Sequence, residues 1–127
     1  MASAHARRAA AVLRDRTRAN RAATRERRAA LIAAHRIRKG ARSLATHVIA
    51  AGFTADTVSG AVNALRNQAR KTGILGAPAR IRRTFIGRAR LVVIVKRYTR
   101  AQVAQLAENW KPRKPEYKAV RAALLAA

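Results

Sequence analysis

The side chains best suited to specific hydrogen bonding lie close together in the middle of this 127-residue sequence. Thr54, Thr57, Ser59, Asn63 and Arg66 fall within one short segment and carry hydroxyl, amide and guanidinium groups. Asparagine can bond both polar atoms on an adenine edge, threonine can contact a thymine methyl group, and arginine can bond guanine. These five side chains could therefore contact base edges if the chain presents them to a nucleic acid.

Basic residues surround this segment. The chain holds 29 Lys and Arg against five Asp and Glu, which gives a formal net charge of +24. Such an excess opposes compaction and indicates a polyanionic partner, of which nucleic acid is the commonest. The candidate phosphate-binding residues are Arg70, Lys71, Arg80, Arg82, Arg83, Arg88 and Arg90. The basic arm nearer the N-terminus adds Arg25, Arg27, Arg28, Arg36, Arg38 and Lys39.

Reactive groups for catalysis are sparse. The five acidic residues are scattered along the chain, and His5, His35 and His47 have no metal-ligand spacing with one another or with a carboxylate. The sequence has no cysteine, which excludes disulfides and thiolate zinc sites, and its six glycines form no phosphate-binding loop motif. We therefore predict no enzyme activity, no catalytic residue, no metal and no cofactor.

Charge divides the chain into unequal parts. Residues 1–39 hold twelve bases and two acids, residues 40–77 four and one, and residues 78–127 thirteen and two. Together with the apolar pattern, this predicts a basic Ala/Arg-rich arm over residues 1–39, a folded domain over residues 40–110, and a basic connector with a C-terminal helix over residues 111–127. The arm is predicted to be helical from Arg25 onward. Before Arg25 it is expected to be frayed or partly disordered, because apolar residues are too sparse for a wide buried stripe.

Two amphipathic helices are predicted in the middle of the chain, where apolar residues recur at steps of three and four. Gly52 separates them, and Phe53 is expected to follow as a buried residue. The second helix is predicted over residues 55–71, with Thr54 as its N-cap and Gly73 as its C-terminal cap.

The run from Gly52 to Asn63, GFTADTVSGAVN, resembles the turn and recognition helix of bacterial helix-turn-helix proteins. Their pattern is Gly, an apolar residue, Ser or Thr, two variable residues, Thr-Val-Ser, a variable residue, Ala, an aliphatic residue and Asn. The sequence departs from the family at Val48, where Ala is usual, and at Thr46 and His47. The resemblance implies that the second helix enters the major groove of DNA and that the five residues named above, Thr54, Thr57, Ser59, Asn63 and Arg66, read bases there. An ordinary helical hairpin stays open as the alternative.

A β-hairpin is predicted after the second helix. Gly76-Ala77-Pro78 is expected to break the chain, and residues 80–86 and 91–97 are typical of strands. Arginines cluster on the first strand and the turn, so we expect the first strand to face phosphate and the apolar second strand to face the core. A recognition helix followed by such a hairpin is similar to winged-helix proteins, in which the hairpin is the wing. The predicted fold class is mainly α with a small β-hairpin, as a winged helix-turn-helix head with a basic N-terminal helical arm and a C-terminal helix.

Two further helices are predicted towards the C-terminus. Thr99 and Gln102 form a capping box, and Trp110 on the apolar face of that helix is expected to close the core. Pro115 suits the first turn of a last helix. Its thin apolar stripe either docks on the domain or pairs with a second copy, and the sequence leaves both open.

These observations predict a DNA-binding protein, a small transcriptional regulator or mobile-element accessory factor of phage or plasmid type, with double-stranded DNA as partner. The alternatives are a structural, ribosomal-type RNA-binding protein and a non-specific DNA-compacting nucleoid protein. The longest weakly charged stretch is too polar for a membrane span, so no membrane partner is predicted, and a homodimer stays open. The predicted location is cytoplasmic and nucleoid-associated, with an organelle as the alternative if residues 1–30 are a transit peptide.

Overall fold

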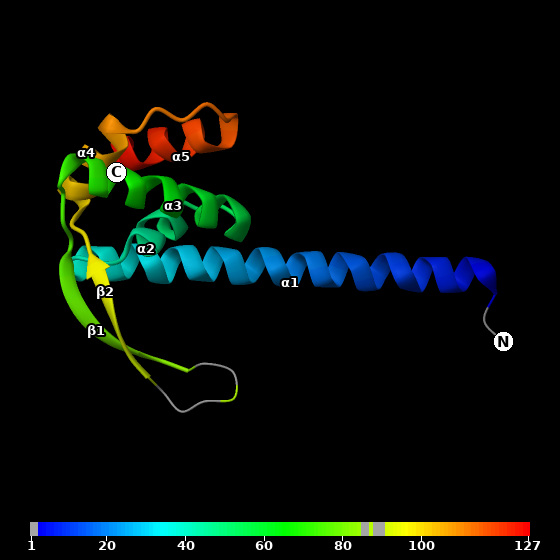
Figure 1. Cartoon of the computed structure of the whole chain (residues 1–127). Coiled ribbons are helices and arrows are strands. Elements are labelled where there is room, and N and C mark those ends of the chain that lie inside the picture. Colours follow the sequence, from blue (N-terminus) through cyan, green and yellow to red (C-terminus); the bar gives the residue numbers. More distant parts are fainter. Residues whose placement is uncertain (1–2, 85–86, 88–90) are drawn as a thin grey trace.

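The computed structural model describes residues 3–84, 87 and 91–127, and these form five helices and one two-stranded antiparallel sheet (Figure 1). The helices are α1 (Ala4–Lys39), α2 (Leu44–Ala50), α3 (Ala55–Thr72), α4 (Arg100–Asn109) and α5 (Pro115–Ala126), and the strands are β1 (Ala77–Arg83) and β2 (Leu91–Arg97). The prediction of a mainly helical chain with a small β-hairpin is therefore confirmed.

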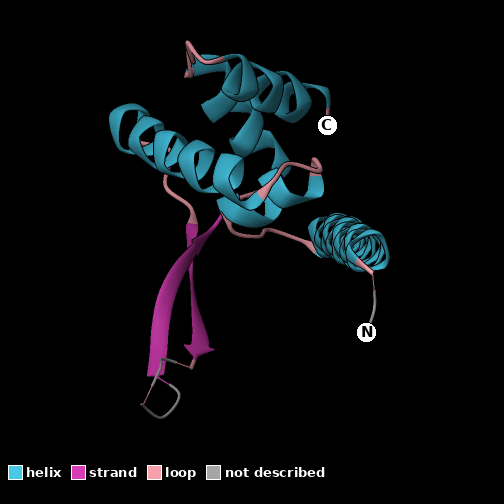
Figure 2. Ribbon diagram, turned by 90° about the vertical axis from the view of Figure 1, so that its right-hand side faces the viewer, coloured by secondary structure: helices cyan, strands magenta, loops and turns pink. Residues whose placement is uncertain are grey.

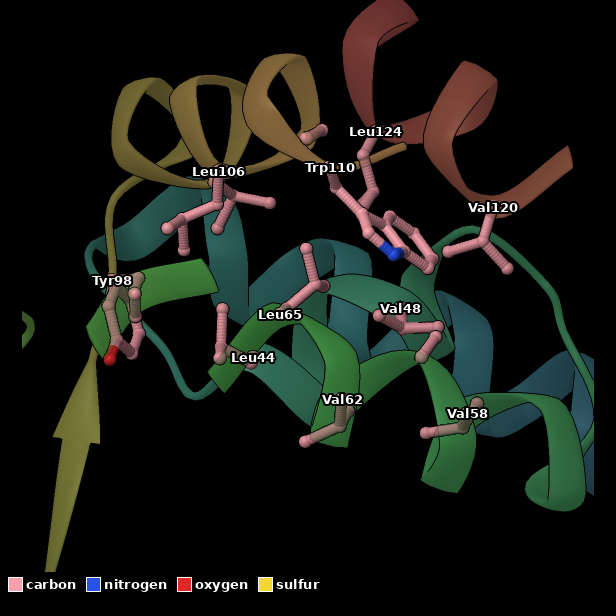
Figure 3. Packing of buried hydrophobic residues seen from close by; sticks show 14 residues of the cluster. Leu44, Val48, Val58, Val62, Leu65, Tyr98, Leu106, Trp110, Val120 and Leu124 are labelled. Atoms are coloured by element: carbon pink, nitrogen blue, oxygen red, sulfur yellow. The ribbon is translucent and has the colours of Figure 1, made fainter. Parts of the chain in front are cut away.

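The hydrophobic core lies among α2, α3, α4 and α5. It is built from aliphatic side chains at helical spacing and from two aromatic residues (Figure 3): Leu44, Val48, Val58, Val62, Leu65, Tyr98, Leu106, Trp110, Val120 and Leu124. Trp110 is buried in it, as the sequence predicted. Val120 and Leu124 belong to the same cluster, so the apolar stripe of α5 is docked on the domain.

Helix α5 approaches α3 closely at Gly60. A Cβ atom on Gly60 would overlap the Tyr117 hydroxyl group and would lie 2.8 Å from Cζ of the same ring. The Tyr117 ring lies 6.1 Å from the Trp110 ring, and Arg121 Nε donates a hydrogen bond of 2.9 Å to the Ala107 carbonyl. The absence of a side chain at Gly60 therefore permits the docking of α5.

Helix α1 is one continuous helix of 36 residues, about 54 Å long at about 1.5 Å per residue. It is helical from Ala4, including the part before Arg25 for which fraying was predicted. Ser3 caps its first turn by accepting a hydrogen bond of 3.1 Å from the Ala6 amide. Ala33, near its C-terminal end, is buried against the domain, and α1 packs on α2. Most of the helix projects away from the core (Figure 1).

The turn between α2 and α3 has the left-handed backbone that its glycine predicted. Gly52 has a φ of 89°, and Gly73, which ends α3, has a φ of 71°. Thr54 is the N-cap residue, but its hydroxyl bonds the Thr57 hydroxyl at 3.1 Å instead of a backbone amide. Phe53 packs against the core but is only partly buried, whereas the sequence predicted a buried residue.

Helices α4 and α5 begin where the sequence placed them. The Thr99 hydroxyl accepts a hydrogen bond of 3.3 Å from the Gln102 amide, and Gln102 Oε1 accepts one of 2.9 Å from the Thr99 amide. This is the predicted capping box. Pro115 opens α5, also as predicted.

Strand β1 begins earlier than predicted. Ala77 and Pro78 pair with Arg97 and Lys96 of β2, where a chain break was expected. Both strands of a two-stranded sheet are edge strands, and an edge strand tolerates a proline because one row of its backbone groups is free of ladder hydrogen bonds. The predicted end of the first strand at Ile86 and most of the turn after it lie outside the described residues.

The prediction that β2 faces the core is wrong. Leu91, Val92 and Ile94 are 46%, 60% and 67% exposed. The hairpin extends past the helices in both views (Figures 1 and 2), and the core is already closed by side chains from α4 and α5. An apolar strand therefore lies at the surface.

The base of the hairpin is fixed to the helices at Tyr98. Its carbonyl accepts a hydrogen bond of 3.0 Å from the Arg42 amide, and its amide donates one of 2.7 Å to the Arg42 carbonyl. His47 Nε2 donates a further hydrogen bond of 2.8 Å to the Tyr98 carbonyl. A Cβ atom on Gly76 would lie 2.8 Å from the Arg97 carbonyl oxygen, so glycine allows the two chain segments to pass here. The hairpin thus leaves the domain in a fixed direction.

Candidate nucleic-acid interface

Helix α3 presents one polar stripe to solvent. Ser59, Asn63, Arg66 and Arg70 are exposed, and their spacing of four, three and four residues places them on one face of the helix. The opposite face is buried and consists of Val58, Ala61, Val62, Leu65 and Ala69. The apolar pattern of α3 therefore fixes the side that a partner can reach, and three of the five predicted base readers lie together on it.

The first turn of α3 differs from this stripe. Thr54 is exposed, whereas Thr57 is half-buried and its hydroxyl is bonded to that of Thr54. Asp56 is exposed in the same turn, where its carboxylate complements the positive end of the helix dipole. A carboxylate repels phosphate but can accept a hydrogen bond from the amino group of cytosine. This end of α3 is thus suited to base edges rather than to a phosphate backbone.

A groove separates α3 from the hairpin. It has a cavity volume of about 390 Å³, and its lining includes Arg66 and Arg70 of α3, Arg83 of β1, and Ser43 at the start of α2. Three guanidinium groups from two elements therefore border one hollow, and no acidic residue is among the described residues that line it. Guanidinium groups pair bidentately with phosphate oxygens. The groove is suited to holding one phosphodiester backbone.

The hairpin arginines lie on both faces of the sheet. The cross-strand pairs are Arg80 with Ile94, Arg82 with Val92 and Arg83 with Leu91. Because side chains alternate between faces along a strand, Arg80 and Arg82 share one face and Arg83 belongs to the other. The predicted single cluster on this strand is therefore divided. Arg83 joins the arginines of α3 at the groove, and the other two lie on the opposite face of the hairpin.

The remaining predicted phosphate-binding residues have different surroundings. Lys71 is exposed in the last turn of α3, next to the groove residue Arg70. Arg88 and Arg90 lie outside the described residues. Lys96 was not among the predicted phosphate-binding residues, but it is exposed and lines the groove together with Arg66, Arg70 and Arg83. Its positive charge within the basic hairpin was the signal that could have identified it.

The basic arm forms a second, separate surface on α1. All six of its predicted members are exposed: Arg25, Arg27, Arg28, Arg36, Arg38 and Lys39. At about 100° per residue they fall on two flanks of the helix, on either side of the buried Ala33. Figure 2 shows α1 end-on beside the helical domain, with the hairpin extending in another direction. The structure therefore does not bring the arm together with the α3 stripe.

His47 is a buried structural residue. Its Nε2 donates a hydrogen bond of 2.8 Å to the Tyr98 carbonyl and so connects α2 to the base of the hairpin. Burial lowers its pKa below the ordinary value, the nearby positive charge of Arg100 acts in the same direction, and backbone hydrogen bonds oppose the shift. The described residues contain no group of three or more His, Asp or Glu side chains that could hold a metal ion. The imidazole thus acts as a hydrogen-bond donor within the fold.

None of the described helices is long and apolar enough to cross a membrane. Comparison with known protein families, curated proteins and solved structures finds no match to this chain. Function is therefore inferred from the surfaces of α3, the hairpin and α1.

Proposed function

We propose that this chain is a double-stranded DNA-binding protein of winged-helix type, a small transcriptional regulator or mobile-element accessory factor associated with the nucleoid in the cytoplasm. Helix α3 lies in the major groove, the hairpin is the wing, and the basic arm on α1 binds the phosphate backbone. The observation that carries the proposal is the exposed stripe of Ser59, Asn63 and Arg66, because it continues into the arginine-lined groove.

The dimensions and chemistry of this stripe support major-groove binding. An α-helix with its side chains is about 10–12 Å across, and the major groove of B-DNA is about 12 Å wide. Asn63 bonds an adenine edge and Arg66 a guanine edge, and each such contact contributes about 1–3 kcal/mol of discrimination against the wrong base. Arg70 and Arg83 hold the adjacent phosphates. Base reading and backbone binding thus use neighbouring parts of one surface.

Non-specific compaction of DNA and structural binding of RNA are the alternatives. The observation that favours them is α1, which presents arginine on two flanks but few groups that read bases. Single-stranded RNA is bound mainly on exposed aromatic platforms. Of the described aromatic residues, Tyr98 and Trp110 are buried, and Phe53 and Tyr117 are partly buried against the core. Duplex DNA therefore fits the described surface better than single-stranded RNA.

Selection from a pool of randomised duplex DNA, with structured RNA present as competitor, tests the proposal. A regulator is expected to enrich a short sequence motif. Recovery of duplexes without a motif would instead identify a compacting protein, and recovery of the RNA would identify a structural RNA-binding protein. Either of these results would contradict the proposal.

A pair of asparagine substitutions tests the role of α3. Asn63→Ala is expected to relax one position of the selected motif, with a loss of about tenfold in affinity for the motif, because one bidentate base contact is removed. Asn109→Ala makes the same chemical change at an exposed residue at the end of α4 and is expected to leave motif and affinity unchanged. Equal effects of the two substitutions would exclude α3 as the reading helix.

A further inference from the structure

A second hollow, the four-helix pocket, lies where α1, α2, α4 and α5 meet, and its cavity volume is about 250 Å³. Ile37 of α1, Val103 of α4 and Leu124 of α5 form apolar parts of its wall, and His47 of α2 is also part of it. No residue lines both this pocket and the groove beside α3. The two are therefore separate sites, and the proposed binding of DNA does not use the four-helix pocket.

Short side chains are the reason for the hollow. Five of the ten residues that line the pocket are alanines: Ala34, Ala50, Ala51, Ala123 and Ala127. Closely packed protein interiors contain few voids larger than a water molecule. A cavity needs only about 10–15 Å³ to hold one water, and an apolar cavity of about 150 Å³ binds benzene. The four-helix pocket therefore has room for one aromatic ring with a short substituent.

The polar side chains of the pocket are few and basic. Among the described residues that line it, Arg100 and His47 are the only basic side chains, and no side chain is acidic. Arg100 is exposed, whereas Val103 and Leu124 are buried, so the guanidinium group lies at the open end and the apolar wall lies deeper. His47 Nε2 is bonded to the Tyr98 carbonyl, so this imidazole is a fixed part of the wall. The pocket thus combines an apolar interior with a positive charge at its mouth.

We infer that the four-helix pocket binds one small carboxylate with an apolar body, such as a phenyl ring on a short acid chain. Arg100 holds the carboxylate, because a guanidinium group can bond both of its oxygen atoms. The apolar body lies against Val103, Leu124 and the alanines of the wall. The net charge of +24 favours an anion over a neutral compound or a cation of the same shape.

The position of the pocket gives such a ligand an effect on the basic arm. Helix α1 packs mainly on α2, close to its own C-terminal end. Ala34 and Ile37 of α1 form one side of the pocket, and residues of α4 and α5 form another. A ligand that fills the pocket therefore adds contacts between α1 and these two helices. Bound carboxylate is expected to slow the hydrogen exchange of backbone amides in residues 33–39, which lie at this end of α1.

Calorimetric titration of the full chain with phenylacetate, in the absence of DNA, tests the inference. The matched probe is phenylacetamide, which has the same ring and nearly the same shape but no charge. Phenylacetate is expected to bind with a dissociation constant on the order of 0.1–1 mM, as suits a ligand of this size. The amide is expected to bind about fivefold more weakly, because it lacks the ion pair with the exposed Arg100.

Two pairs of variants assign the binding to the pocket. Arg100→Gln is expected to weaken phenylacetate about fivefold and to leave the amide unchanged, whereas Arg113→Gln removes an exposed charge in the connector and changes neither. Ala123→Leu fills the pocket and is expected to weaken both probes at least about tenfold. Ala122→Leu makes the same change at the exposed neighbouring residue of α5 and is expected to leave both affinities unchanged.

Three results would overturn the inference: no binding of phenylacetate at millimolar concentration, equal affinity for the acid and the amide, or full binding by a folded Ala123→Leu variant. Unchanged hydrogen exchange in residues 33–39 would show that the ligand does not join α1 to α4 and α5. Circular dichroism checks the fold of each variant, and if Ala123→Leu does not fold, Ala34→Leu fills the pocket from α1 instead. None of these measurements contains DNA, so a negative result leaves the proposed function intact.

Discussion

Replacing Gly60 by alanine tests how closely α5 packs on α3. On an open helix surface this change stabilises a protein by about 0.5–1 kcal/mol, because alanine loses less backbone entropy than glycine. Here the added Cβ atom would overlap the Tyr117 hydroxyl group and would lie 2.8 Å from Cζ and 3.2 Å from Cε1 of the ring. The ring is rigid and packs beside Trp110, so either the Tyr117 side chain must leave its position or one of the two helices must shift.

The sign of the effect follows from comparing the two contributions. Overpacking a closely packed site costs about 1–3 kcal/mol, which exceeds the gain in helix propensity. Gly60→Ala is therefore expected to lower the free energy of unfolding by about 0.5–2 kcal/mol. With Tyr117→Ala already present the ring is absent, and the same substitution is expected to raise the free energy of unfolding by about 0.5–1 kcal/mol.

Urea unfolding followed by circular dichroism gives the free energies of the wild-type protein, both single variants and the double variant. Ser59→Ala serves as a control, because Ser59 is the exposed neighbour of Gly60 and its substitution is expected to change stability by less than about 0.5 kcal/mol. If Gly60→Ala stabilised the protein equally with and without the Tyr117 ring, α5 would not lie over Gly60 as described.

Two further predictions concern His47 and the groove. Burial holds the pKa of folded His47 below its ordinary value of 6.5, so the unfolded chain binds a proton first as the pH falls. Its contribution to stability is expected to be full above pH 6.5 and to be lost as the pH falls towards the lowered pKa, and His47→Gln should reduce this slope in urea unfolding at several pH values. An unchanged slope in that variant would contradict the assignment. In DNA titrations, Arg70→Gln with Arg83→Gln is expected to lower the slope of log affinity against log salt by about 1.8. The control Arg113→Gln changes an exposed residue in the connector between α4 and α5 and should leave the slope unchanged. Equal slopes in both variants would show that the groove holds no phosphate.

Much of the helical domain was predictable because its signals are local. Gly52 and Gly73 mark the ends of α3 through their backbone conformation, and the capping box at Thr99 marks the start of α4. The exposed stripe of α3 follows from the apolar residues on its opposite face. Each of these features depends on residues within a few positions of one another.

The wrong predictions concern contacts between segments that are distant in the sequence. The apolar run of β2 predicted burial, but Val120 and Leu124 of α5 occupy the core instead, and their docking depends on a glycine about sixty residues earlier in the sequence. The meeting of Arg83 with the arginines of α3 depends on the direction in which the hairpin leaves the domain. Neither the docking of α5 nor the position of Arg83 can be predicted from the local spacing of apolar residues.

The length of α1 gives the proposed complex a direction along the DNA. Its 36 residues extend about 54 Å, which corresponds to roughly 16 base pairs of B-DNA at about 3.4 Å each. The helix is attached to the domain near its C-terminal end, so it reaches in one direction only (Figure 1). If the arm follows the duplex as proposed, the protected region is lopsided, with the motif near one border and about one and a half turns of unread DNA beyond it. A single bound molecule then distinguishes the upstream from the downstream side of its site.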